Sequence, residues 1–237
     1  MAGDLYFRQL LAGRDFAQSD PVARQMVNFC YLIGDRQAGV ALGVDIAYGP
    51  AEVVSILEAD GMRLVGTLAT HYHADHVGGE LFGLRIAGLA ELLEVADVPV
   101  YVQRDEIEFV SLSTGIGRDA LVAVEPGTTL SAGDVRVECI HTPGHTPGSQ
   151  CFLVGDRLVA GDTLFLEGCG RTDLPGGDPE ALYHSLFDTL ARVSDDTVLY
   201  PGHLYSADPS ATMGETRANN YVFRLRTPEQ WMTMFGS

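Results

Sequence analysis

Three imidazoles and a carboxylate fall within one short segment, Thr70 to His76, which reads Thr-His-Tyr-His-Ala-Asp-His. The apolar run that precedes it, 64–69, has the character of a buried strand. Because a tight loop after a strand can turn side chains two or three positions apart toward one point, all four groups can reach one small volume. Such groups are ligands of zinc, iron and manganese. The segment therefore predicts a metal site at a strand end, with the candidate ligands His71, His73, Asp75 and His76.

Further candidate ligands stand at other predicted strand ends. Of the seven histidines, His141 and His145 lie in a His-Thr-Pro-Gly-His turn, and His203 follows Pro-Gly. Asp162 follows a glycine at the exit of another apolar run. We expect His141 to orient its loop and His184, inside a predicted helix, to be an ordinary surface residue. The predicted metal site therefore comprises His71, His73, Asp75, His76, His145, Asp162 and His203.

Composition limits the classes of function. The 237 residues are 46% hydrophobic and 20% charged, which predicts a single domain, 1–237, with a substantial core. The formal net charge of -17 and the lack of a basic run argue against a nucleic-acid partner. All 15 basic residues are Arg, so Schiff-base and P-loop lysine chemistry are excluded.

Location and covalent cross-links are also constrained. The four cysteines form no Cys-x-x-Cys pair, so a disulfide framework is not expected in a chain of this length. The first 20 residues carry scattered charges rather than the apolar core of a secretion signal. No apolar run reaches the length of a membrane span. We therefore expect a cytoplasmic protein without a membrane partner, while the oligomeric state stays open.

Hydrophobic periodicity predicts alternating blocks of strands and helices. The expected strands are 5–11, 26–34, 39–44, 64–69, 98–102, 135–140, 149–154, 157–160 and 197–200. The expected helices are 51–60, 105–112, 178–190 and 228–235. Residues 78–94 suit either a broken helix packed on a sheet or a flap over the metal pocket. Two such blocks predict two sheets covered by helices on both sides.

The polar motifs resemble the successive motifs of the metallo-β-lactamase superfamily. The resemblance rests on His71 to His76, His145, Gly161-Asp162 and Pro201-Gly202-His203, and it spans nearly the whole chain. It implies an α+β fold, namely an αββα sandwich of two mixed sheets flanked by helices, with the metal site along one edge of the sheets.

Two longer motifs resemble the glyoxalase II and persulfide dioxygenase branch of that superfamily: the His141 to Ser149 turn and Gly161 to Phe165. Carried over from glyoxalase II, the resemblance implies two divalent metals, zinc or else iron or manganese. One would be held by His71, His73 and His145, the other by Asp75, His76 and His203, with Asp162 between them. Activated water would then cleave the thioester of a small thiol conjugate, of glutathione or another cellular thiol, with Asp75 and Asp162 as catalytic residues.

The rival chemistry uses nearly the same residues. A persulfide dioxygenase would bind one Fe(II) through the residues matching His71, His145 and Asp162. The segment Gly168 to Asp173 shares Gly-Cys-Gly-Arg with glyoxalase II, but its Thr-Asp ending is closer to the dioxygenases. The chain is also too short for the helical domain with which glyoxalase II binds glutathione. We favour the hydrolase, and we rank a β-lactam hydrolase below both because those enzymes lack a ligand of the Asp75 type.

The sequence also suggests residues that contact the substrate. Arg171 can bind a carboxylate on the thiol, or it can form a structural ion pair with Asp173 or Asp178. Tyr72 and Tyr205 are candidates for lining the pocket. A single Cys169 beside a complete set of metal ligands is expected to pack rather than to act as a nucleophile.

Overall fold

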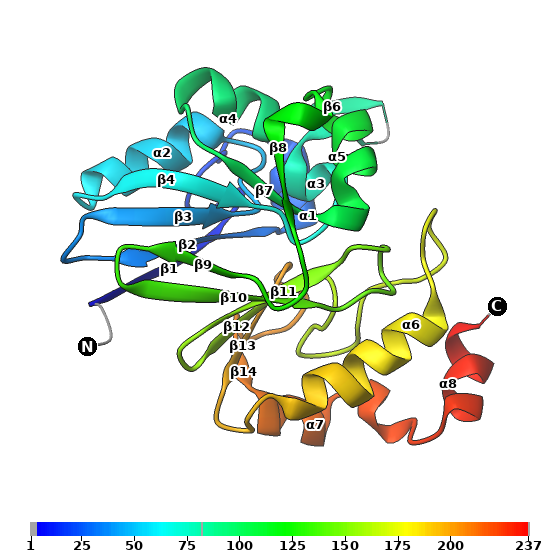
Figure 1. Cartoon of the computed structure of the whole chain (residues 1–237). Helices are drawn as coiled ribbons and strands as arrows, with labels where there is room; N and C mark the ends of the chain where they lie inside the picture. Colours follow the sequence, from blue (N-terminus) through cyan, green and yellow to red (C-terminus); the bar gives the residue numbers. More distant parts are fainter. Residues whose placement is uncertain (1–3, 82, 237) are drawn as a thin grey trace.

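The computed structural model describes residues 4–81 and 83–236. Residues 1–3, 82 and 237 lie outside this part of the chain; they are the ends of the predicted 1–237 domain and one position of the 78–94 segment. The described residues form two six-stranded sheets and a two-stranded hairpin. Figure 1 shows the two sheets face to face, with helices on the outer side of each.

The first sheet has the strand order β1-β2-β3-β4-β7-β8. Its strands are β1 (Leu5–Leu11), β2 (Phe29–Asp35), β3 (Val40–Val44), β4 (Arg63–Leu68), β7 (Val100–Gln103) and β8 (Leu121–Val124). The first three pair antiparallel, whereas β3, β4, β7 and β8 run parallel, so the sheet is mixed. All seven residues of β2 are buried, as its near-continuous apolar run predicts.

The second sheet has the order β14-β13-β12-β11-β10-β9. Its strands are β9 (Thr129–Ala132), β10 (Val135–His141), β11 (Gln150–Val154), β12 (Arg157–Gly161), β13 (Val198–Pro201) and β14 (Ala211–Thr212). Only β12 and β13 pair parallel; the other neighbours are antiparallel. Both sheets are therefore mixed, as the αββα prediction requires.

Helices cover the outer faces of both sheets (Figure 1). The first block contains α1 (Pro21–Met26), α2 (Pro50–Ala59), α3 (Ala74–Val77), α4 (Leu89–Val95) and α5 (Ile107–Thr114). The second contains α6 (Pro179–His184), α7 (Met213–Asn219) and α8 (Pro228–Phe235). Local sequence explains several starts: α1, α6 and α8 each begin at a proline, and the preceding Asp20, Asp178 or Thr227 side chain accepts a hydrogen bond from a backbone N–H of the first turn.

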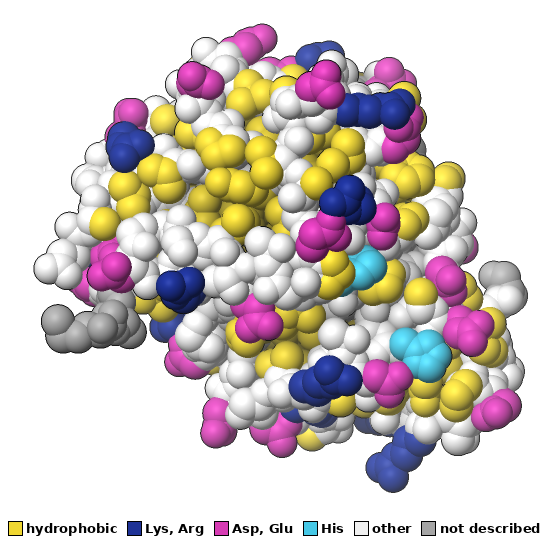
Figure 2. Space-filling view, in the orientation of Figure 1, with side chains coloured by type: hydrophobic (Ala, Val, Ile, Leu, Met, Phe, Trp, Pro, Cys, Tyr) yellow, Lys and Arg dark blue, Asp and Glu magenta, His cyan; other side chains and the backbone are white. Residues whose placement is uncertain are grey.

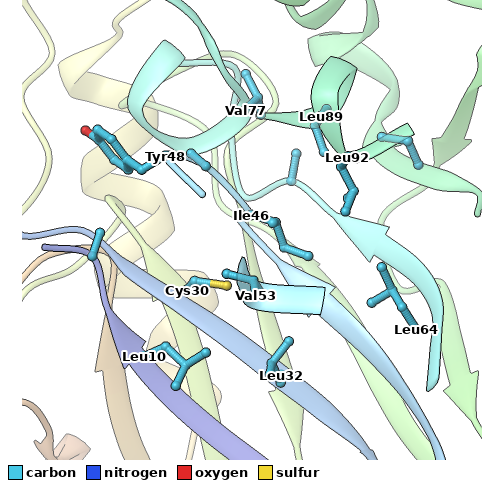
Figure 3. Packing of buried hydrophobic residues seen from close by; sticks show 14 of the residues in the cluster. Leu10, Cys30, Leu32, Ile46, Tyr48, Val53, Leu64, Val77, Leu89 and Leu92 are labelled. Atoms are coloured by element: carbon cyan, nitrogen blue, oxygen red, sulfur yellow. The ribbon is translucent and has the colours of Figure 1, made fainter. Parts of the chain in front are cut away.

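Three clusters of buried hydrophobic side chains hold the layers together. One lies between the first sheet and its helices, one between the two sheets, and one between the second sheet and its helices. Figure 3 shows part of the first cluster, in which Ile46 and Val53 lie between Leu32 and Leu89. Cys30 belongs to this cluster and packs as an apolar side chain.

Three predicted elements differ from the structure. The strand predicted for 26–34 starts only at Phe29, because Met26 ends α1 and Val27 has a left-handed φ of 51°. Residues 78–94 are helical only in their last part: a hairpin, β5 (Gly79–Leu81) and β6 (Leu84–Ile86), comes first and is followed by α4. The helix predicted for 178–190 has α geometry only to His184 and then widens into a π turn, Ser185–Thr189.

The surface fits the acidic composition. On the face drawn in Figure 2, arginine side chains stand apart from one another among acidic ones, and hydrophobic side chains gather over the upper half. In the described part of the chain, no helix has both the length and the apolarity needed to span a bilayer.

Candidate metal centre

Strand ends from both sheets deliver the predicted ligands to one place. β4 ends just before His71, β10 before His145, β12 before Asp162 and β13 before His203. The short helix α3 follows the His71 loop and presents Asp75 and His76, both buried. All seven predicted ligands thus come together, in three compact groups of donor atoms: His71-His73-His145, His71-His76-Asp162 and Asp75-His76-His203.

The first group is built around His73. Its Nδ1 atom lies 3.0 Å from Nε2 of His71 and 3.0 Å from Nε2 of His145. The other ring nitrogen of His145, Nδ1, donates to the backbone oxygen of Arg171 at 2.7 Å. On His71, Nδ1 faces the hydroxyl of Thr70 at 3.0 Å.

The group Asp75-His76-His203 is supported by residues that the sequence did not single out. His76 Nδ1 lies 2.9 Å from Oδ2 of Asp45, and His203 Nδ1 donates to the backbone oxygen of Met26 at 2.8 Å. The Asn28 amide donates to Asp75 Oδ2 at 3.1 Å, and its own oxygen accepts a hydrogen bond from Tyr48. These outer contacts fix the orientation of the ligands.

The outer contacts also assign the protons on the rings. A carbonyl or carboxylate oxygen can only accept, so His145, His203 and His76 carry a hydrogen on Nδ1 and direct Nε2 inward. The Nε2 atoms of His76 and His203 lie 3.2 Å apart. Two unprotonated nitrogens at that distance repel each other, so a proton or a metal cation has to lie between them. The donor set therefore fits a bound divalent metal.

Asp162 lies between the groups His71-His73-His145 and Asp75-His76-His203. Its Oδ1 atom is 3.4 Å from His76 Nε2, and its Oδ2 atom is 3.3 Å from His203 and 3.8 Å from His145. The buried Oδ1 accepts no hydrogen bond within the described structure. A buried carboxylate oxygen without a donor is costly, which again fits a cation at this position.

Burial and charge set the protonation of the cluster. Burial, reinforced by the neighbouring His76 and His73, holds the pKa of His71 well below its usual range, so this ring is a neutral donor. Burial also raises the pKa of Asp162, but His203 and His76 outweigh it and hold that pKa well below its usual range. His71 and Asp162 therefore offer a neutral imidazole and an ionised carboxylate, the forms that bind metals. Burial lowers the pKa of His76, but Asp75, Asp162 and Asp45 outweigh it and raise that pKa to about 10, so a metal that binds His76 displaces a proton.

A cavity of about 770 Å³ opens onto the centre. Its lining includes His73, Asp75, His145, Asp162 and His203. It also includes the three predicted substrate-binding residues, Tyr72, Tyr205 and Arg171. Tyr205 stacks on the His203 ring at 4.6 Å, and Tyr72 stacks on Phe109 at 4.8 Å.

Several sequence predictions about single residues can be placed on this geometry. The Arg171 guanidinium pairs with both oxygens of Asp173 at 2.6 Å, which is the structural alternative considered for it. His141 bonds to the backbone oxygen of Pro147 at 3.0 Å and so bridges the loop of His145, while His184 is exposed and pairs with Asp188. Burial raises the pKa of the Cys169 thiol to about 12, which keeps it protonated.

Strand β5 of the 78–94 segment also reaches the cavity. Glu80 and Leu81 line it, beside Phe109, Leu112 and Ser113 of α5. The other described residues of the segment do not line the cavity. Helix α4 packs into the first hydrophobic cluster through Leu89 and Leu92. The two alternatives for this segment thus describe different halves of it.

The buried carboxylate of Glu106 is a further residue that sequence patterns did not reveal. It accepts a hydrogen bond from the backbone N–H of Gly148 at 2.7 Å and is 1% exposed. Burial raises its pKa to about 7, although contacts with Thr146 and with the backbone of Gly148 and Tyr72 act in the opposite direction. Glu106 thus anchors the loop of His145 through Gly148, while its Oε2 atom accepts no hydrogen bond in the described structure.

A model of the metallo-β-lactamase superfamily matches residues 28–203, the stretch that runs from Asn28 to the last predicted ligand. The chain belongs to the metallo-β-lactamase superfamily. This membership agrees with the αββα architecture, the two mixed sheets and the cluster of His and Asp at their edge.

Relatives within the metallo-β-lactamase superfamily differ in their reactions. The chain is 32% identical over 206 residues to the probable polyketide biosynthesis zinc-dependent hydrolase BaeB of Bacillus velezensis, covering 86% of this chain and 85% of that one. It is also 32% identical to the human mitochondrial persulfide dioxygenase ETHE1, covering 94% and 84%. The crystal structure of ETHE1 from Myxococcus xanthus superposes with a TM-score of 0.80 at 26% identity, covering 98% and 90%.

Proposed function

We propose that the chain is a hydrolase that uses two divalent metals to cleave an acyl thioester into an acid and a thiol. The observation that carries the proposal is the second donor group, Asp75-His76-His203, which is buried and supported by its own hydrogen bonds. Asp162 Oδ1 lies 3.4 Å from His76, and its Oδ2 lies 3.3 Å from His203 and 3.8 Å from His145, so this carboxylate reaches both groups, as a ligand shared by two metals would. A second metal would be held by the group Asp75-His76-His203.

Two divalent cations, held by His71-His73-His145 and by Asp75-His76-His203 with Asp162, would polarise the thioester carbonyl and lower the pKa of a bound water. Residues of the chain would orient the water and transfer its proton. Asp75 and Asp162 are the carboxylates that face the cavity beside this position, and we assign them to orient the attacking water and to receive its proton. Water adds to the carbonyl carbon, and collapse of the resulting tetrahedral adduct breaks the carbon–sulfur bond. The thiolate receives the proton that the carboxylate took from water and leaves as a thiol, while the acyl group leaves as the acid. No protein nucleophile is needed, in agreement with the neutral thiol of Cys169.

The second candidate is a persulfide dioxygenase with one iron, held by His71, His145 and Asp162. The similarity to ETHE1 over 94% of the chain favours it. These three residues also lie close together, but a single iron would leave the buried donor group Asp75-His76-His203 unused. We therefore rank the hydrolase first.

Two assays on protein purified without added metal test the proposal. Thiol release from an S-acyl thioester reports hydrolysis, and oxygen uptake with a thiol persulfide reports the dioxygenase. We expect thiol release without oxygen uptake; uptake without thiol release would overturn the assignment. Asp162→Ala should abolish turnover, whereas Asp156→Ala, a change in an exposed turn, should not.

A further inference from the structure

The walls of the cavity are apolar on two sides. One side consists of Tyr72, Leu81, Phe109 and Leu112; the other includes Phe165, Leu174, Tyr205 and Tyr221. Three of these side chains stay largely uncovered: Leu112 is 73% exposed, Tyr205 52% and Tyr221 46%. Large apolar side chains that face a pocket gain free energy when an apolar ligand covers them.

The charges around the same cavity are acidic. Apart from the metal ligands, its ionisable lining residues include Glu80 of β5 and Glu167 of the loop after β12. Arg171 is the only arginine that lines it within the described part of the chain, and its Nε and Nη2 atoms already pair with Asp173. A thiol carrier with free carboxylates would therefore meet two carboxylates and one arginine whose charge is already paired.

We propose that the cavity selects thioesters that combine an apolar acyl chain with an uncharged carrier arm, and that Glu80 and Glu167 exclude anionic carriers such as glutathione. This inference rests on the proposed thioester hydrolysis and adds the substrate class. The volume of about 770 Å³ suits it, since this is far more space than a two- or three-carbon acyl group fills. The thioester carbonyl reaches the metal ligands at the base, and the acyl chain lies between the walls.

A pair of substrates that differ only in the carrier tests the charge selection. We expect kcat/KM for S-octanoyl-N-acetylcysteamine to exceed that for S-octanoyl-glutathione at least tenfold in the zinc-loaded protein. The deficit of the glutathione thioester should shrink as salt rises, because salt screens the repulsion. Equal values for the two carriers, or a preference for glutathione, would overturn the inference. The acetyl thioester of the uncharged carrier should also have a KM at least tenfold above that of the octanoyl thioester; equal KM values would count against an apolar acyl site.

A double variant tests the two glutamates. Glu80→Gln with Glu167→Gln should reduce the deficit of the glutathione thioester about tenfold. The matched control is Glu58→Gln with Glu94→Gln, which removes the same charge from exposed positions outside the cavity lining. If the control reduces the deficit as much as the cavity variant does, the effect belongs to the net charge of -17 and the assigned role is wrong.

Binding of thioethers separates this inference from the proposed function. S-octyl-N-acetylcysteamine and S-octyl-glutathione cannot be hydrolysed, so calorimetry with the zinc-loaded protein measures the selectivity of the cavity alone. Tighter binding of the uncharged thioether supports the inference even if no thioester is cleaved, in which case only the proposed function fails. Equal or tighter binding of S-octyl-glutathione overturns the inference whatever the assays of hydrolysis give.

Discussion

The Oδ2 atom of Asp45 lies 2.9 Å from Nδ1 of His76, and both side chains are buried. Asp45 stands at the end of β3, where a φ of 53° turns its carboxylate toward the neighbouring parallel strand. The same carboxylate accepts the hydroxyl of Thr70 at 2.6 Å and its backbone N–H at 2.8 Å. Since Thr70 in turn contacts His71, one acidic residue orients a ligand in each donor set.

Asp45→Asn tests this support. The amide keeps the shape of the carboxylate but cannot accept from both Thr70 and His76, so the ligand rings lose their fixed orientation. We expect zinc affinity to fall about 10- to 100-fold, measured by competition with a chromophoric chelator. Asp156→Asn, in an exposed turn, is the control. An affinity equal to that of the unmodified protein would show that Asp45 does not support the ligands.

Gly202→Ala tests the position of Asp162. A Cβ atom on Gly202 would lie 2.2 Å from Asp162 Oδ1, so the carboxylate would have to move. We expect at least about a hundredfold loss of kcat, with an unchanged far-UV circular dichroism spectrum, because a shift of about 1 Å in a reacting group costs this much. Gly117→Ala meets no atom within 4 Å and should keep its activity. Full activity of Gly202→Ala would contradict the placement of Asp162.

Glu106→Gln tests a dependence of stability on pH. The pKa of Glu106 is raised from 4.5 to about 7, so the folded state binds its proton more tightly than the unfolded state does. This contribution to stability is fully present below pH 4.5 and is lost as the pH rises toward about 7. From pH 5 to pH 8, the free energy of unfolding of the unmodified protein should therefore fall by about 2 kcal/mol relative to Glu106→Gln. Urea titrations at both pH values measure it, and parallel changes in the two proteins would refute it.

Trp231→Ala tests how α8 is attached. The indole is fully buried, stacks on Phe235 at 4.3 Å and donates from Nε1 to the backbone oxygen of Pro179 at 2.7 Å. Its removal leaves a cavity and an unpaired carbonyl, so the free energy of unfolding should fall by about 3 to 5 kcal/mol in urea titrations. Met234→Ala, at a position 53% exposed on the same helix, should change it by less than about 0.5 kcal/mol. Similar losses in the two variants would contradict this attachment.

The predictable part of the fold was its strongly patterned part. Strand Leu5–Leu11 and helix Pro228–Phe235 have the predicted bounds, since an apolar run closed by turn residues and a Thr-Pro start are local signals. Strands β8 and β9 were not predicted. They lie at the edges of the two sheets, and each has only four residues, of which two are exposed, so neither run is long enough to mark a strand by itself.

The candidate site also has residues that the sequence predicts and residues that it does not. The seven candidate ligands could be found because each follows a predicted strand and belongs to a His- or Asp-containing turn. Asn28 could not be found, because its partner Asp75 is 47 residues away and no local pattern marks the pair. The end of β3 at Asp45 was the one available signal for a supporting residue, because the ends of parallel neighbours β3 and β4 lie at the same edge.

The central claim is that two metals act together at this site. Its most direct test is a titration of chelator-treated protein with Zn²⁺, in which thiol release from a thioester is measured after each addition. The account predicts that activity rises to its maximum at two equivalents per chain, as expected for the two donor groups that share Asp162. Full activity at one equivalent, or oxygen uptake that saturates with one equivalent of Fe²⁺, would contradict it.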